Sequence, residues 1–186
     1  MILENSAERA KERGFALIST LLSLVIIIIL ASQFFSRSIT QGYIETSSSI
    51  SSDLINFSNI VKNIYIDGNY ANLATANIIT ALTPSSGFVD SNGTTMHSRL
   101  GGAVAFGSTT IATTSYFTIT MDGVGQEYCS WVLSSSRELF SFASVCPDKT
   151  ATGCVQVISP TTAFNPTLVT QECAKRQVSR ILFTGK

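Results

Sequence analysis

The sequence predicts an α+β protein in which a long N-terminal helix, with its apolar half protruding, packs on a mostly antiparallel β-sheet with short helices. Three observations favour this class. A helical pattern runs over residues 15–65, short β-rich segments follow between residues 103 and 183, and four cysteines lie in the C-terminal third. A chain of 186 residues is expected to hold one soluble domain attached to a membrane segment.

Residues 14–36 form an apolar run without a charged side chain. As a helix, this run is about 34 Å long, which is enough to cross a bilayer core of about 30 Å. The preceding leader holds three acids and three bases, and the run is longer than the core of a signal peptide. Both features argue against a cleaved secretory signal. From hydropathy alone, an uncleaved single-span anchor is an equally good interpretation.

Apolar residues continue at helical spacing beyond the run, which predicts an amphipathic second half. They are Ile39, Tyr43, Ile50, Leu54, Phe57, Val61 and Ile64. We expect one helix of about 75 Å from Phe15 to Tyr65, ending near Asp67-Gly68-Asn69. Two helices that break near Ser36 or Gly42 are the alternative.

The remaining elements are short and bounded by glycine or polar residues. A helix is expected within residues 69–82 and a loop over 88–100. Further helices are expected over 126–135, with Cys129, Val132 and Leu133 on one face and Trp131 on its flank, and from Asn165-Pro166 to Cys173. Strands are expected at 103–106, 116–121, 140–145, 155–158 and 178–183.

The four cysteines, Cys129, Cys146, Cys154 and Cys173, predict two disulfides. A zinc site would need all four, because His97 is the only histidine and no CxxC spacing occurs. Disulfides form in oxidising compartments, so the C-terminal domain is expected outside the cytoplasm. Three connectivities are compatible with four cysteines.

The composition gives no case for nucleic-acid binding, because the net charge is zero and only 13% of residues are charged. No catalytic, metal or cofactor constellation is recognisable. His97 is interpreted as a surface residue in a loop, and Gly101-Gly102 as a tight turn. Asp122-Gly123 suits a turn and Glu127 an early helix position.

The residues Arg13-Gly14-Phe15-Ala16-Leu17-Ile18 resemble the prepilin processing site of type IV pilins and type II secretion pseudopilins. The resemblance implies cleavage after Gly14 and N-methylation of Phe15. The family usually has Glu five residues into the mature chain, where this sequence has Ser19. That carboxylate pairs with the terminal ammonium of a neighbouring subunit, so Phe15 needs another acceptor: a hydroxyl of Ser19 or Thr20, or a neighbour's Glu.

Two later stretches, 100–104 and 116–129, resemble the Gly-Gly strand start and the strand, turn and cysteine-bearing helix of type IVb pilins. Cys173-Ala174-Lys175-Arg176 before a terminal strand fits the same family. The outline is most similar to thin-pilus pilins of conjugative plasmids and related enterobacterial pilins. The family pattern pairs Cys129 with Cys173, which leaves Cys146 with Cys154. Asn92-Gly93-Thr94 matches the N-glycosylation sequon, but the bacterial resemblance disfavours modification.

The resemblance implies a non-enzymatic, cofactor-free pilus subunit. Its partners are other pilin subunits, the prepilin peptidase, the assembly machinery and the inner membrane, and it passes from that membrane to an extracellular fibre for adhesion, aggregation or mating. The expected parts are a cleaved leader (1–14), an apolar transmembrane and fibre-core half-helix (15–36), an amphipathic half-helix (37–66) and a globular head (67–186). A minor or priming pilin, a pseudopilin and a membrane-anchored binding module are the alternatives.

Overall fold

A computed structural model describes residues 22, 24–31, 46, 48–82, 88–90, 92–150 and 152–186. The chain divides into two units, Met1–Gly42 and Tyr43–Lys186. In the first unit residues 24–31 are helical, and the described large apolar residues between 22 and 30 are 49–65% exposed. Among the described residues, no helix combines the length and the apolar character needed to span a membrane.

The predicted processing and assembly residues Gly14, Phe15 and Ser19 lie outside the described residues. The same holds for the segment that would decide between one continuous helix and two helices. The described part of the second half is helical over residues 48–64. Its end at residue 64 confirms the predicted stop near residue 65.

The 48–64 helix buries the predicted apolar stripe. Ile50, Leu54, Phe57 and Val61 are at most 2% exposed, because their spacing of three or four residues places them on one face. Ile64, the last helical residue, is 43% exposed, so the buried stripe ends one turn earlier than predicted. The Phe57 ring packs edge-on against an aromatic ring of the sheet, and the two ring centroids lie 5.6 Å apart.

Helix α2 covers only Thr75–Ala81, a shorter span than the predicted 69–82. Polar side chains explain the late start. The Asp67 carboxylate accepts a hydrogen bond from the Asn69 backbone N–H, and the Asn69 side chain accepts one from the Ala71 N–H. Such local bonds compete with helical hydrogen bonding and hold the preceding residues in turns.

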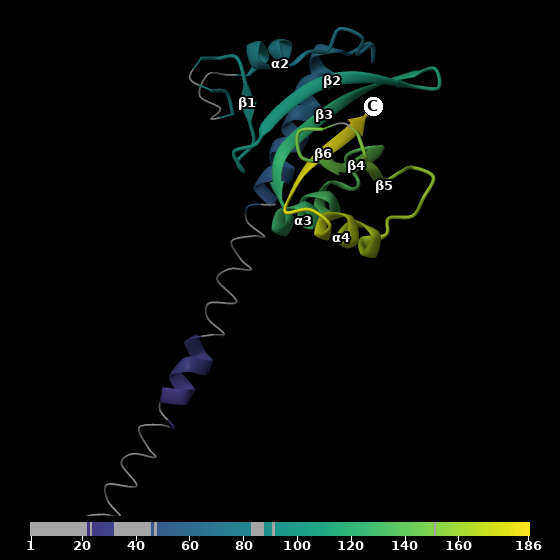
Figure 1. The fold of residues 1–186 in the computed structure, drawn as a ribbon. Coiled ribbons are helices and arrows are strands. Elements are labelled where there is room, and N and C mark those ends of the chain that lie inside the picture. Colours follow the sequence, from purple (N-terminus) through teal and green to yellow (C-terminus); the bar gives the residue numbers. More distant parts are fainter. Residues whose placement is uncertain are drawn as a thin grey trace, which may run out of the picture. The chain divides into compact units, whose positions relative to one another are not determined.

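The described strands form one six-stranded sheet in the order β1-β2-β3-β6-β4-β5, and every neighbouring pair is antiparallel. The strands are β1 (Met96–His97), β2 (Ala103–Ile111), β3 (Thr114–Gly125), β4 (Phe142–Pro147), β5 (Val155–Ile158) and β6 (Val178–Gly185). This confirms the predicted α+β class. Figure 1 shows the 48–64 helix, in blue, lying across one face of the sheet.

The predictions for β2, β3 and β6 were placed correctly but too short, and the prediction for β4 lies two residues too early. The prediction for β5 matches its bounds, whereas β2 and β3 form a long hairpin that continues to Ile111 and restarts at Thr114. The polar run after Gly107 suggested a strand end, yet backbone pairing with β3 keeps it extended. The turn itself is made by Ala112, which adopts φ +56°.

Residues 88–100 contain β1, so the prediction of an uninterrupted loop there is wrong. His97 lies in β1 and donates its backbone N–H to the Phe88 carbonyl at 2.7 Å, while Val89 bridges to Met96. Pairing with the start of β2 produces this strand. Such pairing is a non-local effect that the loop-like composition conceals.

Candidate functional site

The C-terminal half carries both disulfides, and they are built on two short helices and one strand connection. Helix α3 (Gln126–Ser136) begins where β3 ends. Its first N–H has a partner outside the helix, the Gln177 carbonyl at 3.0 Å. Glu127 stands in the first turn, as predicted, where its charge complements the helix dipole.

The faces of α3 match the prediction. Cys129, Val132 and Leu133 are fully buried at helical spacing, and Trp131 is 46% exposed beside them. Ser136 continues the buried face, with its hydroxyl donating to the Val132 carbonyl. The buried cysteine therefore points from α3 into the protein rather than to solvent.

Helix α4 (Pro166–Ala174) carries the partner cysteine. The Asn165 side chain caps the helix by accepting from the backbone N–H groups of Thr167 and Leu168, at 3.0 and 3.2 Å. Pro166 occupies the first turn, where its missing N–H costs nothing. Cys173 is thereby placed opposite Cys129, and the two form a disulfide across a sequence separation of 44.

The second disulfide joins Cys146, on β4, to Cys154, just before β5, across a separation of eight. Both pairings are those that the resemblance implies. Within the described residues no free cysteine occurs, and no group of His, Cys, Asp or Glu side chains could hold a metal ion.

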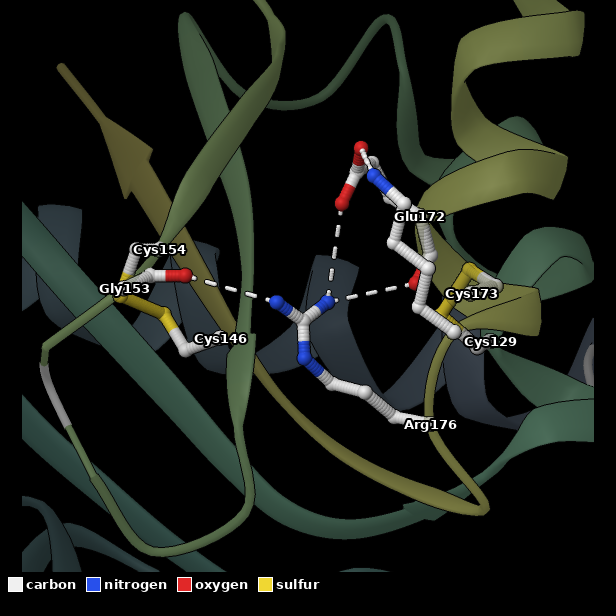
Figure 2. A network of polar contacts seen from close by, with 8 residues as sticks. Cys129, Cys146, Gly153, Cys154, Glu172, Cys173 and Arg176 are labelled. Atoms are coloured by element: carbon white, nitrogen blue, oxygen red, sulfur yellow. Dashed lines mark hydrogen bonds and ion pairs between the residues drawn. A yellow bond between two sulfur atoms is a disulfide. The ribbon is translucent and has the colours of Figure 1, made fainter.

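A polar network that the sequence reasoning missed connects the two disulfides. Figure 2 shows the Arg176 guanidinium between the short loop and the end of α4. It donates to the Gly153 carbonyl at 3.4 Å and to the Glu172 carbonyl at 3.2 Å, and lies 3.7 Å from the Glu172 carboxylate. Gly153 precedes one disulfide cysteine in the sequence, and Glu172 precedes another. One side chain therefore holds both regions.

Glu172 is only 5% exposed, which is unusual for a carboxylate. It is paired with Lys175 and Arg176 on the same helical surface. A buried charge is tolerated when it has such partners. The spacing of three and four residues in the sequence was the available signal for this cluster.

Asp122 has a different role from the predicted one. It lies within β3, where the register shifts between Met121 and Val124, and Gly123 takes φ +69°. A bulge therefore replaces the predicted turn. The bulge aims the Asp122 carboxylate at Arg180 of β6, with an oxygen–nitrogen distance of 2.9 Å. This hydrogen bond raises the pKa of Arg180 above its ordinary value.

The Gly101-Gly102 pair turns the chain next to this bulge, which confirms a tight turn. Gly101 takes φ +81°, and a Cβ on Gly102 would lie 1.7 Å from the Asp122 carbonyl oxygen. A groove of about 560 Å³ opens beside these residues. Its carboxylates are already engaged, since Asp122 pairs with Arg180 and Asp148 accepts from the Gly123 N–H.

His97 has no catalytic neighbour among the described residues. Its Nε2 lies 3.3 Å from the Thr95 hydroxyl on the same short segment, and its side chain is half-buried at the sheet edge. A helix covers a sheet, and two disulfides fasten its C-terminal elements.

We compared the sequence and the fold with those of known proteins. No family model matches the chain, and no curated protein matches its sequence. The solved crystal structure of TcpA, a type IV pilin from Vibrio cholerae El Tor biotype, matches 76% of this chain and 99% of that chain, with a TM-score of 0.54. This chain has the fold of a type IV pilin. The sequence identity is 20%, so the likeness establishes the fold.

Proposed function

We propose that this chain is a structural subunit of a type IV pilus of the IVb class. The type IV pilin fold is the observation that carries the proposal. The exposed apolar side chains between residues 22 and 30 support it, because such a surface requires lipid or other helices around it. The two disulfides fit a domain that works outside the cytoplasm.

In this proposal the precursor is anchored in the inner membrane by the apolar half-helix, residues 15–36. A prepilin peptidase removes the leader after Gly14 and the new terminus at Phe15 is methylated. The assembly machinery then transfers the half-helix from lipid to a fibre core made of identical helices. The head forms the exterior of a fibre that serves adhesion, aggregation or conjugative mating, and the subunit catalyses no reaction.

The processing step is tested on protein sheared from the surface of the native host. We expect a chain that starts at Phe15 and carries one additional methyl group. Gly14→Val should leave unprocessed precursor in the membrane, whereas Asn5→Gln, a matched change within the leader, should be processed normally. An intact N-terminus at Met1 in surface fibres would contradict the proposal.

Ser19 favours a second candidate, a minor or priming subunit, because the usual carboxylate is absent there. A subunit at the tip has no successor whose ammonium would need that carboxylate. For a major subunit adapted to serine, Ser19→Glu should lower the fibre yield or leave it unchanged. A large rise in fibre yield would instead show that Ser19 limits assembly and would support the minor subunit.

Deletion of the gene separates the remaining alternatives. Loss of surface pili is expected of a major subunit. Pili that persist on the deletion strain exclude that role and leave a minor pilin or a pseudopilin of a secretion system. Protein that never enters the sheared fraction supports a membrane-anchored binding module.

A further inference from the structure

The sequence contains three Asn-X-Ser/Thr triplets, which differ in how accessible they are to a modifying enzyme. They begin at Asn56, Asn92 and Asn165. The triplet at Asn165 has proline in the middle position, which excludes it as a glycosylation sequon. The Asn165 side chain is also occupied as the cap of α4.

The triplet at Asn56 lies inside the 48–64 helix. Its other members, Phe57 and Ser58, are 2% and 6% exposed. A transferase that must bind the triplet in an open conformation cannot reach the buried hydroxyl of Ser58 without unfolding the helix. This triplet is inaccessible while the 48–64 helix is folded.

The triplet Asn92-Gly93-Thr94 is exposed at all three positions. It lies on the turn that leads into β1, at the edge of the sheet opposite β5. Gly93 takes φ +69° and donates its N–H to the Asp90 carbonyl at 3.0 Å, so a tight turn presents Asn92. Within the part of the chain that the structure describes, the side-chain hydrogen bonds of this triplet go to Asp90.

Asp90, two residues before Asn92, fastens this turn. Its carboxylate accepts from the backbone N–H groups of Thr94 and Thr95, at 2.8 and 3.1 Å, and from the Thr94 hydroxyl at 3.3 Å. These bonds fix the two ends of the turn, while Asn92 and Gly93 face solvent.

The bacterial resemblance alone disfavours modification of this sequon, but its exposure at all three positions reverses that expectation. We propose that Asn92 is an N-glycosylation site of the exported protein. The donor would be a lipid-diphosphate-linked oligosaccharide. A bond forms between Asn92 Nδ2 and the anomeric carbon of the sugar, and the bond from that carbon to the diphosphate breaks. The lipid diphosphate leaves with the electron pair, and the amide nitrogen loses one proton to a base of the transferase.

A glycan at this edge would counteract the tendency of fibres with so little charge to associate. The net charge is zero and 13% of residues are charged, which favours association between identical fibres. A glycan is bulky and solubilising. The inference rests on the proposed function to the extent that the head must be exported.

The test is peptide mapping by mass spectrometry of the full chain from the native host, in both the sheared and the membrane fractions. We expect the peptide that contains Asn92 to carry the mass of an oligosaccharide on that residue. Asn92→Gln and Thr94→Val should abolish the added mass, whereas the matched Thr94→Ser keeps the hydroxyl and should retain it. Fibres of Asn92→Gln should also form larger bundles than fibres of Thr94→Ser.

An unmodified Asn92 in both fractions would overturn the inference, as would added mass that persists in Asn92→Gln. Protein absent from the sheared fraction but glycosylated in the membrane fraction would contradict the fibre role and support the glycan. The two proposals therefore fail separately.

Discussion

The two disulfides of the head close very different lengths of chain. Cys129–Cys173 joins two helices across a sequence separation of 44, whereas Cys146–Cys154 spans eight residues between strands that are already paired. Both cysteines of the long bond are at most 2% exposed, whereas the short bond joins the buried Cys146 to the half-buried Cys154. The distinction lies in how far the chain would otherwise spread when it unfolds.

The comparison indicates that a cross-link contributes most to stability where few other contacts hold the same segments together. In the chain-entropy treatment, the long loop is worth about 4 kcal/mol and the short one about 2.6 kcal/mol. The short loop is additionally closed by the β4–β5 ladder and by the Arg176 bond to Gly153. Its disulfide therefore duplicates contacts that the fold already provides.

The largest expected effect comes from removing the long disulfide. Cys129→Ala with Cys173→Ala should lower the free energy of unfolding by about 2–5 kcal/mol, because the unfolded chain regains the freedom of the long loop. Urea denaturation of the full chain in detergent measures the change. A loss below about 1 kcal/mol would show that the helix contacts alone hold α3 to α4.

Removal of the short disulfide should have a smaller effect. Cys146→Ala with Cys154→Ala is expected to cost at most about 2.6 kcal/mol in the same measurement, since the β4–β5 pairing persists. The double variants are compared in one buffer so that only the cross-link differs. An equal or greater loss than that of the long disulfide would refute the comparison.

Arg176 tests whether the two regions are coupled. Arg176→Met should cost about 1–2 kcal/mol, because it breaks charge-assisted bonds to the Gly153 and Glu172 carbonyls. When Arg176→Met is combined with loss of the short disulfide, the decrease in the free energy of unfolding should exceed the sum of the two separate decreases by about 0.5–1 kcal/mol. The reason is that in each separate variant the remaining interaction, disulfide or arginine, still holds the loop at Gly153.

Lys175→Met is the matched control for Arg176→Met. Lys175 donates to the Glu172 carboxylate and not to Gly153, so Lys175→Met should combine additively with loss of the short disulfide. A strictly additive cycle for Arg176 and the short disulfide would mean that the network does not connect the two regions.

The smallest effect is expected in the turn at Asp90, which a carboxylate closes instead of a disulfide. Hydrogen bonds from the Thr94 and Thr95 N–H groups lower the pKa of Asp90 to about 2. The contribution of this turn is therefore complete above the ordinary carboxyl pKa near 3.8 and is lost as the pH falls towards 2.

Amide exchange at Thr94 and Thr95 measures this loss. Protection should decrease between pH 4 and 2 in the native sequence, after correction for intrinsic exchange. In Asp90→Asn it should already be low at pH 6. Protection in Asp90→Asn equal to that of the native chain would contradict the role of the carboxylate.

Much of the head follows from local patterns. Apolar spacing located the buried face of the 48–64 helix, and Asn165-Pro166 located the start of α4, because caps and amphipathic faces are encoded by neighbouring residues. The disulfide pairing followed from a family resemblance, since four cysteines alone leave three connectivities. Strand lengths were less predictable, because partner strands extended β2 through its polar end.

The sequence by itself determined the periodic and chemical features of this protein: the uncharged run over residues 14–36, the amphipathic helix, the cysteine number and the sequons. These depend on residues close together in the chain. Only the tertiary structure decided that Arg176 joins two disulfide regions, that Asp122 pairs with Arg180, and that Ser58 is buried while Thr94 is exposed. Those outcomes depend on contacts between distant segments, whose geometry exists only after the sheet has paired and the helix has packed on it.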